Sequence, residues 1–153
     1  DEPLAVASPD VGGVKRAQLW REALEAVLGK PVAQAFVDKR RAAGVVSGGE
    51  LVAGEVSGAT VLIVDDLIAT FGTIERAAGA LRKAGARRIL AFAAHGLFVP
   101  PAAEALERTC VERVFVTDTV PPFRLEGRPA RGRVDVLPCA ALFADAIRHE
   151  LAG

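Results

Sequence analysis

The chain has 153 residues, of which 51% are hydrophobic and 25% charged, and its 19 basic residues balance its 19 acidic ones. This length and composition predict one globular domain and argue against intrinsic disorder. A net charge of zero provides no overall field for nucleic acid or an anionic membrane. No apolar run approaches the roughly 20 residues that span a bilayer. We therefore expect a cytoplasmic protein without a nucleic-acid or membrane partner.

Short apolar runs alternate with amphipathic segments along the whole chain. In chain order, the pattern predicts a strand at 4–8, a helix at 14–28, strands at 31–37, 51–56 and 60–64, a helix at 74–84, a strand at 88–94, a helix at 101–108, strands at 113–117 and 133–137, and a helix at 139–151. Residues 38–50 and 121–131 are predicted as loops. The alternation predicts an α/β fold, a parallel twisted sheet with helices on both faces. In such sheets, ligands bind beyond the carboxyl ends of the strands.

The strongest chemical pattern lies between residues 61 and 73. A buried β-branched run ends at Asp65 and Asp66, and Thr70, Gly72 and Thr73 follow at the start of a helix. Glycine allows the backbone to approach an anion, and threonine hydroxyls and helix N-terminal amides donate to it. The pattern suits a ligand with a phosphate and vicinal hydroxyls, such as a ribose phosphate. The alternative is an acidic strand end followed by a helix that Thr70 or Thr73 caps.

Two further segments fall at predicted strand ends. Residues 8–13 read Ser-Pro-Asp-Val-Gly-Gly, in which Asp10 is placed to hold a hydrated Mg²⁺ against a phosphate, although an ordinary turn has the same composition. Residues 38–41 read Asp-Lys-Arg-Arg, whose cations could close over a phosphoryl group or simply be solvated. His95 follows another strand, as an acid/base group, a ligand contact or a structural histidine.

Together these motifs resemble a known family. Residues 64–73 resemble the phosphoribosyl-pyrophosphate (PRPP) binding motif of type I phosphoribosyltransferases. The wider set resembles the C-terminal half of the ribose-phosphate pyrophosphokinase (PRPP synthetase) family, in the same order: residues 8–13 with Arg16-Ala17, then 38–41, 64–73, 94–96 and 116–119. The resemblance covers nearly the whole chain. It implies a phosphoribosyltransferase-like fold, in which residues 1–153 form one domain, the C-terminal domain of a longer two-domain chain.

The resemblance also implies an activity and a set of site residues. The activity is transfer of a diphosphate group from Mg-ATP to ribose 5-phosphate, with PRPP and AMP as products, Mg²⁺ as cofactor and a homo-oligomer as the assembly. Lys39 and Arg41 would be the catalytic loop cations, Asp10 would hold the metal, and Gly12, Gly13 and Lys39 would line the pyrophosphate side. Ribose 5-phosphate would be bound by Asp65, Asp66, Ala69, Thr70, Phe71, Gly72 and Thr73.

Two positions depart from the family pattern. Ala69 stands where an acidic residue is usual, and Phe71 stands where Gly or Ala is usual. A side chain as bulky as Phe71 must point away from the anion loop or narrow it. Two other functions therefore stay open: a PRPP-dependent phosphoribosyltransferase, and a non-catalytic regulatory homologue that binds ribose phosphates.

Overall fold

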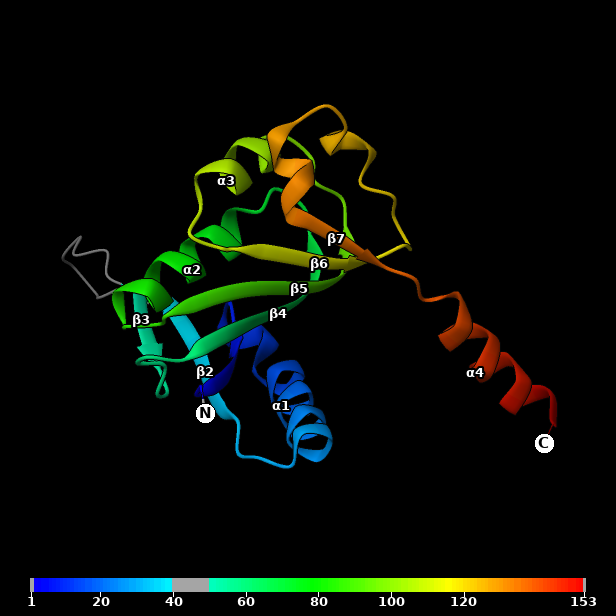
Figure 1. Ribbon diagram of the computed structural model, residues 1–153, viewed down its shortest axis with the longest axis horizontal. Coiled ribbons are helices and arrows are strands. Elements are labelled where there is room, and N and C mark those ends of the chain that lie inside the picture. Colours follow the sequence, from blue (N-terminus) through cyan, green and yellow to red (C-terminus); the bar gives the residue numbers. More distant parts are fainter. Residues whose placement is uncertain (1, 40–49, 153) are drawn as a thin grey trace.

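The computed structural model describes residues 2–39 and 50–152. Within them, seven strands form one sheet in the order β3-β2-β1-β4-β5-β6-β7 (Figure 1). All neighbouring strands are parallel except β3, which runs antiparallel to β2 at one edge. The strand bounds are β1 Leu4–Ser8, β2 Ala33–Lys39, β3 Glu50–Ala53, β4 Thr60–Ile68, β5 Arg88–Gly96, β6 Arg113–Thr117 and β7 Val134–Leu137.

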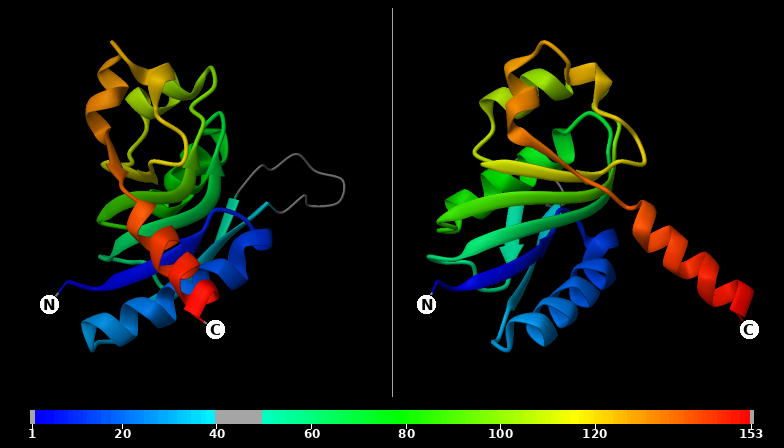
Figure 2. Two further views of the ribbon diagram at one scale, coloured as in Figure 1. Left: turned by 90° about the vertical axis from the view of Figure 1, so that its right-hand side faces the viewer. Right: turned by 45° about the vertical axis from the view of Figure 1, so that its right-hand side comes forward.

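Helices lie on both faces of this sheet, as Figure 2 shows, so the predicted α/β architecture is confirmed. The bounds are α1 Val14–Leu28, α2 Gly72–Lys83, α3 Ala102–Arg108 and α4 Ala140–Ala152. Short 3-10 turns stand at η1 Val11–Gly13, η2 Phe123–Leu125 and η3 Pro129–Arg133, so the predicted loop at 121–131 has local helical structure. None of the helices among the described residues has the length and apolarity that crossing a membrane requires.

The larger core lies between the sheet and the helices α2 and α3. It combines the inward residues of the strands with the buried sides of both helices, for example Ile63, Leu81 and Leu106. A smaller cluster under α1 joins Val6, Val64 and a few neighbours. Because β4 is covered on both faces, its first half can be a continuous apolar run.

Beyond its first turns, α1 leaves several large apolar residues at the surface. Ala17 is buried, whereas Leu19, Val27 and Leu28 are exposed and Trp20 is partly so. The helix ends where predicted, since Gly29 takes the left-handed conformation (φ 64°) and its N–H donates to the Glu25 carbonyl at 2.9 Å.

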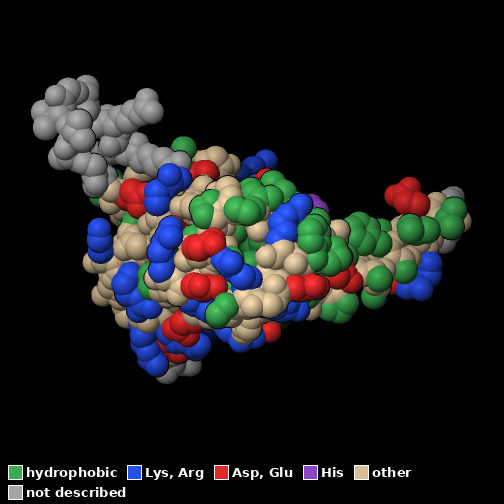
Figure 3. Space-filling model, turned by 90° about the horizontal axis from the view of Figure 1, so that it is seen from above, with side chains coloured by type: hydrophobic (Ala, Val, Ile, Leu, Met, Phe, Trp, Pro, Cys, Tyr) green, Lys and Arg blue, Asp and Glu red, His purple; other side chains and the backbone are tan. Residues whose placement is uncertain are grey.

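The last helix, α4, projects away from the sheet (Figures 1 and 2). Its apolar residues Leu142, Phe143, Ile147 and Leu151 are exposed, and Figure 3 shows hydrophobic side chains along this arm. Within the described part of the chain, these apolar side chains of α4 therefore have no surface to pack against.

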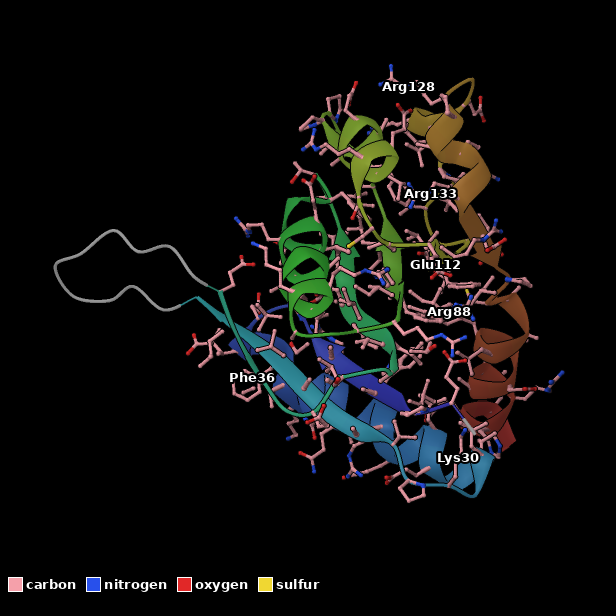
Figure 4. All side chains as sticks on the ribbon, turned by 60° about the vertical axis from the view of Figure 1, so that its left-hand side comes forward. Lys30, Phe36, Arg88, Glu112, Arg128 and Arg133 are labelled. Atoms are coloured by element: carbon pink, nitrogen blue, oxygen red, sulfur yellow. The ribbon has the colours of Figure 1, made fainter. Side chains whose placement is uncertain are left out.

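An ion pair and several side-chain to backbone hydrogen bonds connect the elements in the β5–β7 half of the fold. Arg88 of β5 pairs with Glu112 just before β6, at 2.9 Å between Nη2 and Oε2 (Figure 4). Arg133 donates to the carbonyls of Leu106 and Thr109 at 2.5 and 3.3 Å, which joins η3 to the end of α3.

Candidate functional site

Two adjacent carboxylates occupy the second half of the central strand β4. The strand was predicted to end at Val64, but it continues to Ile68, and Asp65 and Asp66 therefore lie within it. The extension has a simple cause: β5 is nine residues long, and its ladder with β4 continues through Leu67–His95 and Ile68–Gly96. The Asp65 side chain is 18% exposed and the Asp66 side chain 66% exposed.

Arg16, from the first turns of α1, binds both carboxylates. Its Nη1 lies 3.1 Å from Oδ1 of Asp65, and its Nη2 lies 2.8 Å from Oδ2 of Asp66. Oδ1 of Asp65 also accepts the Asp66 backbone N–H at 2.9 Å. The sequence marked Arg16 only as part of a motif and gave it no role, because nearly 50 residues separate it from its partners.

The two carboxyls differ in their affinity for a proton. Burial, reinforced by the nearby Asp66 carboxylate, raises the pKa of Asp65 to about 6, although Arg16 and the Asp66 N–H oppose that rise. For Asp66, slight burial acts in the raising direction, but the hydrogen bond with Asp65 and the charge of Arg16 outweigh it and lower the pKa. A proton taken up by the pair near pH 6 therefore resides mainly on Asp65.

The segment after β4 forms a small cradle at the start of α2. Residues 65 and 67–74 line a cavity of about 90 Å³. Phe71 is the N-cap residue of α2, and within the described chain no side chain caps this helix. The alternative in which Thr70 or Thr73 serves as a helix cap is therefore wrong. Free N–H groups at a helix start can bind an anion.

The Phe71 ring is buried in the core, although the residue also borders this cradle. Its side chain is 2% exposed and belongs to the larger core, while its backbone has φ 67°, a left-handed conformation. That conformation is rare for a bulky residue and explains why glycine suits the position. The anion loop keeps its backbone shape because the aromatic ring packs beneath it.

Asp10 organises the turn between β1 and α1. Its Oδ1 accepts the N–H groups of Gly12 and Gly13 at 2.9 and 3.2 Å, and Ser8 Oγ donates to the Asp10 carbonyl at 2.5 Å. The N–H groups of the two glycines that were expected to line the pyrophosphate side therefore donate to Asp10 here. A Cβ on Gly13 would lie 2.5 Å from Ser8 Oγ and 3.2 Å from Arg16 Nη1, so glycine makes room for the Ser8 hydroxyl and also eases the approach of that arginine.

A magnesium ion would find a partial set of ligands at this turn. Within residues 2–39 and 50–152, no group of three His, Cys, Asp or Glu side chains is arranged to hold a metal. Mg²⁺ in phosphoryl-transfer sites keeps several waters and takes one or two carboxylates plus substrate phosphates. Asp10, which uses Oδ1 in the turn, fits that mode through its other oxygen.

The predicted loop cations are only partly placed. Asp38 and Lys39 were expected at the start of a loop, but they belong to β2, where they pair with Leu51 and Glu50 of β3. Since β2 lies beside β1 in parallel, the chain leaves β2 at the edge where the Asp10 turn begins. Arg40, Arg41 and the side chain of Lys39 lie outside the described residues.

His95 lies at the end of β5, where Nδ1 is 2.7 Å from Thr119 Oγ1. Thr117 Oγ1 donates to the Ala94 carbonyl at 2.6 Å. These bonds join the ends of β5 and β6 and give His95 a structural partner. The contact needs the sheet order, which brings residues 24 apart together.

An aromatic cavity of about 260 Å³ adjoins the carboxylates, and sequence reasoning missed it. The rings of Trp20 and Phe92 lie 5.4 Å apart between centroids, and those of Phe92 and Phe115 stack at 4.7 Å. The lining is completed by Arg16, Asp65, Asp66, Ala93, Ala94, Thr117 and Leu137. A signal was available in the sequence: Phe92 and Phe115 each stand between two buried residues of their strand, so each ring points to the opposite face of the sheet from those neighbours.

Comparison with known proteins places this arrangement in context. The family model of the phosphoribosyl synthetase-associated domain matches residues 46–151. A ribose-phosphate pyrophosphokinase from Clostridium acetobutylicum is 40% identical over 97% of this chain and 44% of its own length. One from Chromobacterium violaceum is 40% identical over 97% of this chain and 43% of its own length.

The crystal structure of phosphoribosylpyrophosphate synthetase from Mycobacterium smegmatis has a TM-score of 0.80 to this chain at 35% identity. The match covers 99% of this chain and 46% of that one. The chain thus has the fold of one half of that enzyme, and it spans less than half the length of these relatives.

Proposed function

The chain belongs to the phosphoribosyl synthetase-associated domain family, and on that basis we propose that it is the C-terminal domain of a ribose-phosphate pyrophosphokinase. The complete protein transfers a diphosphate group from Mg-ATP to ribose 5-phosphate. One observation carries the proposal: a pair of carboxylates stands beside the uncapped start of α2, at the carboxyl ends of the central strands. A diol and a phosphate on one small sugar match these two features.

Ribose 5-phosphate binds across this edge of the sheet. Its hydroxyls donate to Asp65 and Asp66, and its 5-phosphate accepts N–H groups from residues 69–73 and the first turn of α2. Ala69 and Phe71 depart from the family pattern, but the backbone supplies most of this contact. Since the Phe71 ring lies in the core, it leaves the phosphate cradle open.

Diphosphate transfer then depends on position and charge rather than on a covalent intermediate. The anomeric oxygen of the sugar forms a bond to the β-phosphorus of ATP and releases its proton to solvent, while the bond from that phosphorus to the α,β-bridging oxygen breaks and AMP leaves. Lys39 and Arg41 stabilise the charge on the transferred group. Gly12 and Gly13 line the pyrophosphate side of the site.

The residue assigned to the metal is Asp10. When bound, Mg²⁺ neutralises charge on the ATP phosphates. Asp10 fits this role because the turn holds its carboxylate at the end of β1. We extend the proposal to a cytoplasmic homo-oligomer, whose mass by light scattering would be a multiple of the protomer mass.

The test is to mix the full-length protein with ribose 5-phosphate and Mg-ATP and to follow ³¹P NMR. New resonances of PRPP and AMP are expected. Unchanged ATP, together with calorimetric binding of ribose 5-phosphate, would favour the regulatory homologue, for which the alanine at position 69 is the supporting feature. Release of pyrophosphate from added PRPP and a purine or pyrimidine base would instead favour a phosphoribosyltransferase.

A further inference from the structure

The contact between α1 and β4 is more specific than the docking of a helix on a sheet requires. Arg16 uses its two terminal nitrogens on two different carboxylates, Nη1 on Asp65 and Nη2 on Asp66. A guanidinium has a rigid planar fork, so this arrangement sets the distance and the relative orientation of both acceptors. The absence of a side chain at Gly13 leaves space for the fork.

The oxygens that Arg16 uses leave a matching pair for a ligand. It takes Oδ1 of Asp65 and Oδ2 of Asp66. The second oxygen of each carboxylate can then accept one hydroxyl. Two such oxygens on neighbouring residues suit two adjacent hydroxyls, which is the vicinal diol of a ribose.

Charge gives Arg16 a second reason to be present. Asp65 and Asp66 are adjacent carboxylates, and one of them is largely buried, an arrangement that favours sharing a proton. Of the described groups that face Asp65, Arg16 from α1 is the cation and Asp66 of its own strand is the anion. The neighbouring Phe92 and Ala93 of β5 are uncharged. A shared proton would turn one acceptor into a donor.

We propose that Arg16 is the positioning residue for sugar recognition: its guanidinium holds Asp65 and Asp66 ionised and oriented so that they accept the 2- and 3-hydroxyls of ribose 5-phosphate. This role rests on the proposed function, because it names that substrate. It differs from a structural bond between α1 and β4, since it predicts an effect on the choice between sugars.

The test compares two sugars on the full-length protein. Isothermal titration calorimetry measures Kd for ribose 5-phosphate and for 2-deoxyribose 5-phosphate, which lacks one hydroxyl of the diol. The wild type is expected to favour the ribose form by about tenfold or more, the usual loss when a charge-assisted hydrogen bond is missing. In Arg16→Gln that ratio is expected to fall toward one, through weaker binding of the ribose form.

Two further variants separate recognition from folding. Arg16→Lys keeps the charge but lacks the rigid planar fork that orients both carboxylates, and an intermediate ratio is expected. Arg21→Gln removes another arginine of α1, one that pairs with Glu25 instead, and should keep the wild-type ratio. Arg16→Lys also decides the matter if Arg16→Gln does not fold.

Each outcome bears on one proposal or the other. A wild-type ratio in both Arg16 variants, or a wild type that does not distinguish the sugars, overturns the role of Arg16. A wild type that distinguishes the sugars and Arg16 variants that distinguish them less, while Mg-ATP yields no PRPP, overturn the proposed function and leave Arg16 as a determinant of sugar binding.

Discussion

At the scale of single residues, Phe71 links the core to the anion loop. Its φ of 67° costs roughly 1–2 kcal/mol for a residue with a Cβ. Its buried ring offsets that cost, since removing a phenylalanine from a core costs roughly 3–5 kcal/mol. The bulky residue is therefore compatible with the loop because it stabilises the layer beneath it.

This balance predicts an unusual order of variants. Phe71→Ala should lose about 3 kcal/mol or more of unfolding free energy, because it removes the buried ring while the strain of a Cβ in a left-handed conformation remains. Phe71→Gly should be at least as stable as Phe71→Ala, the reverse of the usual preference for alanine over glycine. Urea denaturation of both variants gives the comparison, and the usual order would show that the backbone is relaxed.

The carboxylate pair predicts how sugar binding depends on pH. Asp65 accepts a hydroxyl more strongly when it is ionised, and its pKa is raised to about 6, mainly by burial. Ribose 5-phosphate should therefore bind well above pH 6 and progressively less well as the pH falls through that value. Calorimetry between about pH 5 and 8, a range that brackets this pKa, measures the affinity for ribose 5-phosphate. The control is Asp65→Asn, which has no carboxyl to titrate at this position.

The same shift has a consequence for folding. The pKa of Asp65 in the folded state is higher than 3.8, the ordinary value of an aspartate in an unfolded chain. The folded protein therefore binds more protons between these values, so this residue favours the folded state most at low pH and loses that contribution as the pH rises through about 6. Replacing Asp65 with Asn should flatten this part of the stability profile.

At the scale of elements, α2 and α4 make opposite use of an apolar face. Leu81 of α2 is fully buried against the sheet, whereas Ile147 of α4 is 59% exposed. Burial against the core holds α2 on the sheet. Helix α4 extends from the edge strand β7 without a comparable partner in the described chain (Figure 1).

A matched pair of truncations tests this difference. Leu81→Ala should cost about 2–5 kcal/mol of unfolding free energy, as large-to-small changes do in cores. Ile147→Ala should change it by about 0.5 kcal/mol or less, as is usual at the surface. Denaturation of the 153-residue chain measures both. A large loss for Ile147→Ala would mean that α4 packs against another surface in solution.

At the scale of the whole molecule, the chain is one α/β unit that corresponds to less than half of its relatives. The carboxyl ends of its parallel strands bring together the Asp10 turn, the carboxylate pair and the α2 cradle. Its exposed apolar helix faces and the aromatic cavity at Trp20 lie outside the main core. The catalytic activity is therefore proposed for the complete protein rather than for this part of it.

Much of the fold followed from local pattern. The strand at 4–8 and the helix at 14–28 were predicted with the bounds that the structure has. The pattern was less precise at β4, whose polar second half reads as a loop until its pairing with β5 is known. It was also wrong about Asp38 and Lys39, which were predicted in a loop. They belong to β2 because they pair with the edge strand β3, whose sequence has only a weak strand pattern.

The sequence by itself determined the alternation of strands and helices, the position of the Asp65–Asp66 pair and the family resemblance, because these depend on residues close together in the chain. Only the tertiary structure decided that Arg16 spans both carboxylates, that the Phe71 ring lies in the core and that the start of α2 is uncapped. Those features depend on which faces of distant elements meet. Periodicity gives the direction of a side chain but not its partner across the sheet.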